Sequence, residues 1–229
     1  NVVNPDDVIA QYGADTFRLF EMFLGQLDKA KPWNTASIEG VNRFVHKFWK
    51  LATAPEGGLN PRVKDLPESE WPPALRTTFH KTIQQVGHDI ETLGFNTAVS
   101  AFMILLNELA DFANSKEIVP KYALDVFARL LAPFAPHIAE EVWELLGHAE
   151  PVARAPWPVF DPALTVANEL ELGVQVNGKL RDTVRVPKDI AEAELKALVL
   201  ERDGVKKWLD GKEPKKFIYV KGKIVSVVV

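Results

Sequence analysis

The spacing of apolar residues changes once along this chain, and this change limits the fold more than any other feature. Up to about residue 147, apolar side chains recur at intervals of three and four, the spacing of one face of an α-helix. From about residue 172, apolar and polar residues alternate, as along a half-buried β-strand. We therefore predict a helical domain over residues 1–160 and a small α+β domain over residues 169–229. Four prolines lie near the boundary: Pro151, Pro156, Pro158 and Pro162.

Glycines and prolines divide the helical region into segments. The first helix is expected to begin at Pro5, with Asn4 as its N-cap, and to continue to about Leu24. Further helices are expected over about 37–52, 75–93, 96–114, 120–131 and 138–146. Each apolar face has to be buried against another element. We therefore predict a mostly α protein whose helices form an antiparallel bundle.

The C-terminal region shows the pattern of two hairpins. Asn177-Gly178 separates two alternating runs and predicts a tight hairpin, because a type I′ turn needs positive φ at both central residues. A helix to about Glu201 and a shorter helix follow. A second hairpin is expected around Lys221-Gly222. The predicted order is strand, strand, helix, short helix, strand, strand.

The charge of the chain is unevenly distributed. Residues 1–168 carry a net charge of −7 and residues 169–229 a net charge of +3, within a total of −4. Residues 205–229 hold seven basic and two acidic side chains. A basic region of this kind is a candidate contact for a polyanion, and the alternative is the solvated surface of a small domain.

Several kinds of site are not expected. The chain has no Cys, so disulfides and thiolate metal sites are excluded, and no apolar run approaches the roughly 18 residues of a membrane span. Its five histidines lack the i, i+4 spacing of a helical metal site. No nucleophile-elbow, Walker or dinucleotide-binding motif occurs. We predict neither a catalytic residue nor a metal ligand in this chain.

Basic side chains remain as candidates for binding a nucleic acid. Lys179, Arg181 and Arg185 occupy odd positions of one predicted strand, so we expect them on one face, with Leu180, Val184 and Val186 on the other. Lysine and arginine neutralise phosphates without reading sequence. The candidates in this domain are Lys179, Arg181, Arg185, Lys215, Lys216, Lys221 and Lys223.

Two further observations concern aromatic and bundle residues. Trp208 has the chemistry to stack on an unpaired base, but its spacing from Val205 and Leu209 favours a place in the core. In the helical domain, Arg43, Lys47 and Lys50 lie three and four residues apart on one helix. They are weaker candidates, with ordinary surface charge as the alternative.

Two segments of the helical region resemble class I aminoacyl-tRNA synthetases. Asn1–Phe23, with Tyr12-Gly-Ala-Asp15 and Phe17-Arg-Leu-Phe20 at its centre, is similar to the segment that follows the Lys-Met-Ser-Lys-Ser loop. Leu130–Trp143 resembles a helix-pair corner in the anticodon-binding bundle of the leucine, isoleucine, valine and methionine enzymes. Both resemblances place the chain in the subfamily of class I synthetases for leucine, isoleucine, valine and methionine.

The C-terminal region makes the resemblance more specific, because it favours the leucyl enzymes within this subfamily. Val174–Arg181, together with Lys215–Val225, is similar to the last domain of bacterial leucyl-tRNA synthetases, and Lys31-Pro-Trp-Asn34 is also leucyl-like. The valyl relatives end in a coiled coil and the isoleucyl ones in a Cys-rich module, which this sequence lacks. A valyl- or isoleucyl-type fragment, and a non-catalytic helical interaction module, are the alternatives.

The resemblance implies a tRNA-binding role. The parent enzyme would join leucine to tRNA(Leu) with ATP and Mg²⁺ and act as a cytoplasmic monomer, with its catalytic domain before Asn1. This fragment, which lacks the catalytic motifs, should be inactive alone. The bundle would bind along the tRNA, the C-terminal domain would reach the tRNA elbow, and the first helix would couple the bundle to the catalytic loop.

Overall fold

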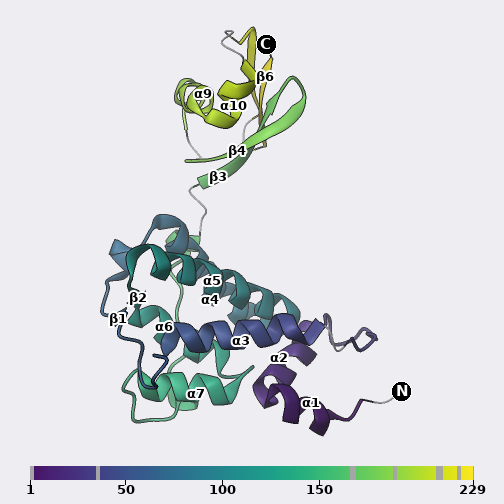
Figure 1. The fold of residues 1–229 in the computed structure, drawn as a ribbon, viewed down its shortest axis with the longest axis vertical. Coiled ribbons are helices and arrows are strands. Elements are labelled where there is room, and N and C mark those ends of the chain that lie inside the picture. The colour runs from purple at the N-terminus through teal and green to yellow at the C-terminus, as the bar shows by residue number, and fades with distance from the viewer. Residues whose placement is uncertain are drawn as a thin grey trace. The chain divides into compact units, whose positions relative to one another are not determined.

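The computed structural model describes residues 3–34, 37–165, 169–187, 190–209, 214–220 and 223–228. The chain packs as two compact units, Asn1–Thr165 and Val166–Val229, and each is described by itself. The first unit is helical, and the second combines a four-stranded sheet with two helices (Figure 1). The predicted fold class, a mostly α bundle followed by a small α+β domain, is confirmed.

The first unit is built from long helices and two very short strands. α4 and α5 are joined by two residues and therefore form an antiparallel hairpin, which packs beside α3 (Figure 1). β1 (Val63–Lys64) and β2 (Val119–Pro120) pair in parallel. The helices are α1 (Pro5–Tyr12), α2 (Ala14–Phe23), α3 (Ile38–Ala52), α4 (Pro73–Thr92), α5 (Phe95–Lys116), α6 (Lys121–Leu131), α7 (Pro136–Leu145) and α8 (Pro162–Thr165), with 3₁₀ turns at Glu68–Glu70 and Val152–Arg154.

Aromatic rings fill the centre of this unit. Phe127 of α6 stacks on Phe48 of α3 with ring centroids 4.7 Å apart, and Phe102 of α5 meets Phe134 edge to face at 5.2 Å. All four side chains are buried. Burying one such side chain stabilises a fold by about 1.5–3 kcal/mol. Within the described residues, no helix has the length and hydropathy that a bilayer crossing requires.

The expectation of one continuous helix from Pro5 to about Leu24 is wrong. Gly13 has φ 84° and ψ 155°, which ends α1 and starts α2. Glycine reaches such positive φ at little steric cost. The predicted start is confirmed, because the Asn4 side chain accepts a hydrogen bond from the Asp6 N–H at 3.2 Å.

The second unit follows the predicted order of elements. Its strands are β3 (Glu169–Val176), β4 (Lys179–Pro187), β5 (Lys216–Val220) and β6 (Ile224–Val228), and its helices are α9 (Glu192–Glu201) and α10 (Asp203–Leu209). The sheet order is β4-β3-β6-β5, with β3 and β6 parallel and the other pairs antiparallel. Asn177 (φ 49°) and Gly178 (φ 77°) both have the positive φ predicted for the first turn. Lys221 and Gly222 of the second turn lie outside the described residues.

One face of this sheet is buried and the other is open. The buried face carries Leu172, Val174, Val184, Val225 and Val227, which form one core with side chains of both helices. The opposite side chains of the same strands therefore form the outer face of the sheet. A basic side chain on β4 therefore lies either on the face covered by the helices or on the open outer face.

Candidate nucleic-acid interface

A β-bulge decides where the basic side chains of β4 lie. Val174 of β3 pairs with Asp182, whereas the next residue, Gln175, pairs with Leu180. Arg181 is therefore an extra residue on β4, and the alternation of side chains reverses across it. The prediction that Lys179, Arg181 and Arg185 share one face is wrong for this reason.

Leu180 shows the effect of the bulge. It was expected on the buried face, but its side chain is 61% exposed. It lies across Gly173 on the outer face, where a Cβ on that glycine would be only 2.9 Å from Leu180 Cδ1. The missing side chain at Gly173 leaves room for this leucine.

Arg185 lies on the outer face and is already paired. Its Nε donates to Glu171 Oε2 at 3.2 Å, across the β3–β4 ladder. Both side chains are largely exposed, and exposed pairs of this kind contribute about 0–1 kcal/mol. The carboxylate nevertheless offsets the positive charge of Arg185 locally, which makes it a weaker phosphate contact than an unpaired cation.

Arg181 lies against α10. Its Cζ is 3.4 Å from the centroid of the Trp208 ring. The expectation that Trp208 is a core residue is wrong, because its side chain is 45% exposed. The short helix buries Val205 and Leu209 and leaves Trp208 at the edge, where the guanidinium covers part of it.

A second arginine and a carboxylate are paired beside this contact. Arg202 donates to both oxygens of Asp182, from Nε at 2.6 Å and from Nη2 at 3.2 Å. These hydrogen bonds hold the pKa of Asp182 below its ordinary value and raise the pKa of Arg202. Asp182 is therefore engaged by Arg202 and not by its neighbour Arg181.

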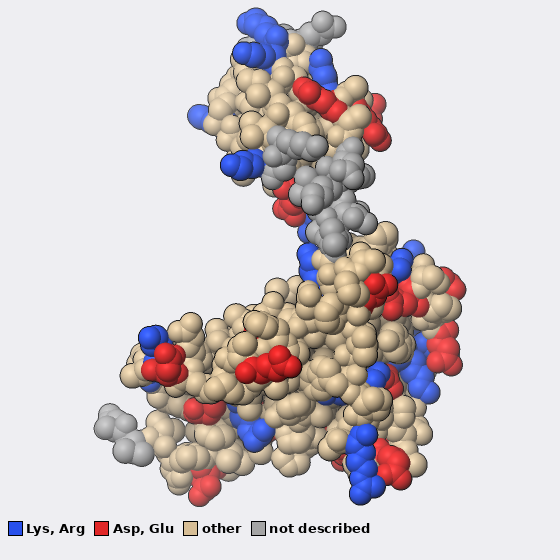
Figure 2. All heavy atoms as spheres, turned by 180° about the vertical axis from the view of Figure 1, so that it is seen from behind, with Lys and Arg blue, Asp and Glu red and all other residues tan. Residues whose placement is uncertain are grey.

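The lysine candidates do not form one cluster. Lys179 begins edge strand β4, and Lys216, with Lys215 before it, begins the opposite edge strand β5. Three strand spacings separate these edges, roughly 14 Å. These lysines and Lys223 are exposed and form no ion pair with a carboxylate of the described residues. Figure 2 shows separate groups of Lys and Arg on one face of this unit. Lys221 lies outside the described residues.

The three bundle candidates lie on α3 but have different surroundings. Lys47 Nζ donates to Asn107 Oδ1 of α5 at 2.7 Å. Arg43 is exposed beside it, and both line a hollow between α3 and α5. Lys50 is exposed in the last turn of α3, where a positive charge favours the negative end of the helix dipole. Its position therefore has a structural explanation as well.

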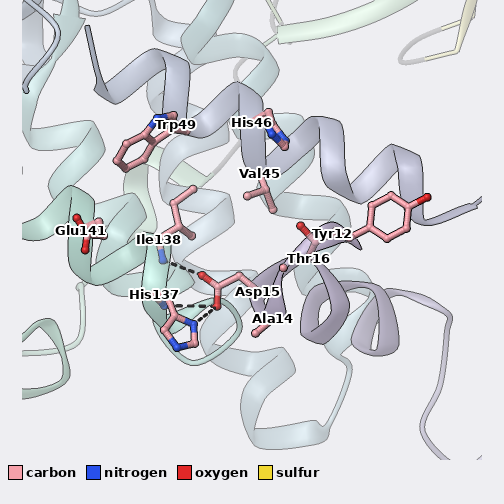
Figure 3. A pocket seen from close by; sticks show the side chains of 11 residues that line it. Tyr12, Ala14, Asp15, Thr16, Val45, His46, Trp49, His137, Ile138 and Glu141 are labelled. Carbon is pink, nitrogen blue, oxygen red and sulfur yellow. Dashed lines mark hydrogen bonds and ion pairs between the residues drawn. The ribbon is translucent and has the colours of Figure 1, made fainter. Parts of the chain in front are cut away.

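The two segments that carried the resemblance in the helical unit contact each other directly. Asp15, in the first turn of α2, is 8% exposed, and its carboxylate binds the start of α7 (Figure 3). It accepts hydrogen bonds from the Ile138 N–H at 2.7 Å, from the His137 N–H at 3.4 Å and from His137 Nδ1 at 2.8 Å. Sequence reasoning missed this contact, although a carboxylate is the natural partner for the free N–H groups at a helix start.

Arg18, one turn further along α2, completes the joint. Its guanidinium donates to the backbone carbonyls of Pro133 and Phe134 at 2.9 and 3.1 Å. These carbonyls belong to the corner between α6 and α7. Asp15 and Arg18 together fasten α2 to both sides of that corner.

A pocket opens beside this joint, between the α1–α2 break, α3 and α7 (Figure 3). Its walls include Val45, Trp49 and Ile138, with His46 and Glu141 at the rim. Tyr12 donates its hydroxyl to Glu39 at 3.1 Å, and this hydrogen bond raises the pKa of Tyr12. His137 contacts Asp15 through Nδ1 and is thereby part of the same joint. The arrangement fits a packed joint better than a reaction centre.

The described part of the chain contains no group of three or more His, Asp or Glu residues placed to hold a metal ion. The chemistry that these residues do offer is electrostatic and stacking contact with an anionic partner. The basic side chains of the second unit and of α3 supply the charge, and Trp208 supplies an exposed ring.

Comparisons with known proteins agree with this interpretation. The chain is 45% identical to "Leucine--tRNA ligase" of Cytophaga hutchinsonii and 48% identical to that of Christiangramia forsetii, over all 229 of its residues. It spans about a quarter of the length of these relatives, 24% and 23%. The predicted resemblance to leucyl enzymes is therefore confirmed.

A solved structure shows the same likeness. The crystal structure of the ternary complex of the Agrobacterium radiobacter K84 agnB2 LeuRS with tRNA and LeuAMS matches with a TM-score of 0.63 and 28% identity, covering 100% of this chain and 30% of that one. Residues 74–197, more than half of the chain, match the family described as the anticodon-binding domain of tRNA ligase. This chain thus belongs to the family of tRNA ligase anticodon-binding domains.

Proposed function

We propose that this chain is the tRNA-binding C-terminal portion of a leucyl-tRNA synthetase, whose whole protein attaches leucine to tRNA(Leu). The observation that carries the proposal is the 45–48% identity to leucine ligases along the entire chain, the α+β unit included. The relatives compared above are leucine ligases rather than valine or isoleucine ligases. The proposal also places the protein in the cytoplasm as a monomer.

The chain's own part in that activity is binding. ATP and Mg²⁺ would serve the upstream catalytic domain of the parent, and the residues described in this chain do not fit them. Neither a phosphate-cradling loop nor a carboxylate cluster is present among them. We assign no chemical step to this chain.

The phosphate contacts in the second unit are proposed to be the unpaired cations. Among the residues predicted from the sequence, these are Lys179, Lys215, Lys216 and Lys223, with Lys221 as a candidate outside the described residues. Arg185 is a weaker candidate because Glu171 offsets its charge. On the bundle, Arg43 and Lys47 beside the α3–α5 hollow are proposed before Lys50.

The joint between α2 and the α6–α7 corner supports a coupling role. Asp15 and Arg18 hold α2 to the corner through hydrogen bonds to backbone groups on both sides. A shift of the bundle on binding tRNA would therefore move α2 with it. We propose that this joint transmits tRNA binding toward the catalytic part of the parent.

Electrophoretic binding of this chain to tRNA(Leu) and to another long-armed tRNA, at several salt concentrations, tests the proposal. We expect affinity for tRNA(Leu) that falls with salt, with log K changing by about 0.7–0.9 per log salt for each phosphate neutralised. A helical interaction module would show no tRNA affinity even at low salt. That result would refute the proposed function.

A further inference from the structure

We propose that Arg181 and Trp208 form a stacking site for one unpaired nucleobase of the bound RNA. This inference rests on the proposed function and deepens it. It gives Arg181, which the sequence predicts only as a nucleic-acid contact, a specific role beside Trp208.

The geometry leaves one face of the indole open. Arg181 Cζ lies 3.4 Å from the centroid of the Trp208 ring. At this distance a planar guanidinium has to lie nearly parallel to the ring, because a steep tilt would drive one of its nitrogens into the ring atoms. One face of the indole is thus covered. Since Trp208 is still 45% exposed, the exposed surface belongs to the opposite face and the edge.

Three local features of the chain hold the ring in this position. The bulge diverts Arg181 from the strand alternation and lets it reach α10. Gly204 lets the start of α10 approach β4 closely, since a Cβ there would lie 2.9 Å from Asp182 Oδ2. Val205, one turn before Trp208, is fully buried and anchors the helix. The ring is therefore preorganised before any partner binds.

The Arg181 guanidinium contacts the Trp208 ring but no carboxylate of the described residues. The nearest carboxylate in sequence, Asp182, is bound by Arg202 through two hydrogen bonds. Arg181 forms no ion pair with the described residues, and its buried Nε has no hydrogen-bond partner among them. Its planar group is therefore engaged by the Trp208 ring rather than by a carboxylate.

The chemistry of the pair fits a nucleobase. Every base has a planar π face, and an aromatic ring with a stacked guanidinium binds such a face without reading sequence. Lys206 and Lys207 lie next to Trp208 on α10 and are exposed, so the backbone of a stacked nucleotide would meet positive charge. An acidic side chain would be disfavoured on the open aromatic face, which carries the negative part of the ring's quadrupole.

Salt-dependent binding to tRNA separates stacking from phosphate contact. Arg181→Lys keeps the charge but removes the planar group, and Trp208→Ala removes the ring. We expect each to weaken binding of the 229-residue chain to tRNA(Leu), Trp208→Ala by about 10- to 100-fold. The slope of log K against log salt should stay at the wild-type value. Trp208→Phe keeps an aromatic face and should retain most of the affinity.

Lys216→Ala is the matched control, because it removes an exposed cation that makes no cation–π contact with the described residues. It should lower the salt slope by about one unit. Tryptophan fluorescence adds a second readout. Stacking of a base on Trp208 should quench emission on titration with tRNA, and Trp208→Phe should lose that part of the quenching.

The outcomes distinguish the two proposals. If Arg181→Lys and Trp208→Ala bind like wild type, or if Arg181→Lys binds normally while Arg181→Ala lowers the slope, Arg181 does not stack and this inference is overturned. The tRNA-binding function would stand. If the wild-type chain binds no tRNA at any salt concentration, both proposals are overturned. Circular dichroism of each variant checks that the fold is retained.

Discussion

Replacing Asp15 by alanine removes the contact between α2 and the start of α7. The carboxylate is buried and accepts hydrogen bonds from two backbone N–H groups and one imidazole nitrogen. The shortest of these, from the Ile138 N–H at 2.7 Å, lies in a buried environment where water cannot readily replace the acceptor.

The size of the effect follows from these contacts. A hydrogen bond to a charged group contributes about 1.5–3 kcal/mol, and a buried N–H left without an acceptor costs about 1–3 kcal/mol. Loss of a helix N-cap alone costs about 0.5–2 kcal/mol. These three ranges cannot be added, because they describe the same hydrogen-bonded groups. We expect Asp15→Ala to lower the free energy of unfolding of the bundle by about 2–4 kcal/mol.

Urea unfolding followed by far-ultraviolet circular dichroism measures this change. The chain has two compact units, so the helical transition has to be fitted separately from that of the α+β unit. Glu21→Ala is the control, since Glu21 is exposed on the same helix and should change stability by less than about 0.5 kcal/mol. If Asp15→Ala and Glu21→Ala unfold at the same urea concentration with equal slopes, the joint does not stabilise the bundle and the reasoning fails.

Three further predictions use other features of the chain. Gly13→Ala should destabilise the bundle by about 1–2 kcal/mol, because alanine is strained at φ 84° although no neighbour is within 4 Å; an unchanged urea midpoint would show that the α1–α2 break adapts. Hydrogen bonds from Arg202 lower the pKa of Asp182 in the folded chain. The stability that Asp182 contributes is therefore present above pH 3.8, its ordinary pKa in the unfolded chain, and is lost as the pH falls through the lower pKa of the folded chain. Thermal unfolding of wild type and Asp182→Asn should therefore differ at pH 7 and converge in acid, and a constant difference would contradict this. In salt titrations with tRNA, Lys216→Ala should reduce the slope more than Arg185→Ala, and equal reductions would mean that Glu171 does not offset the charge of Arg185.

The helices and hairpins were predictable because burial imposes a period on the sequence. The stripes of apolar residues located α3 to α7, and Asn177-Gly178 located the turn between β3 and β4. Period alone did not reveal the break at Gly13. A single glycine within a helical pattern is compatible with a continuous helix, and only its backbone φ and ψ show whether the helix ends there.

The candidate site was harder to predict for a related reason. Assigning residues to faces of a strand assumes that every residue pairs, and one extra residue at Arg181 reverses the assignment. The bulge has no signature in the sequence, since Lys-Leu-Arg-Asp alternates well enough for an ordinary strand. The contact of Trp208 with Arg181 could not be inferred because it depends on that bulge. The sequence predicts which types of residue take part, but their neighbours depend on the register of the strands.

The separation of charge between the two units limits how this chain can bind RNA. The bundle carries a net charge of −7 and the α+β unit +3. At physiological salt, charges are screened beyond about 8 Å, so only carboxylates within about that distance offset the charge of an exposed lysine. Counterion release requires cations next to phosphates. Most of the salt dependence of tRNA binding should therefore come from the lysines of the α+β unit, and the bundle should contribute mainly shape and a few local contacts such as Arg43. Neutralising Lys179, Lys215 and Lys216 together should remove more of the slope than neutralising Arg43, Lys47 and Lys50, although each set removes three charges.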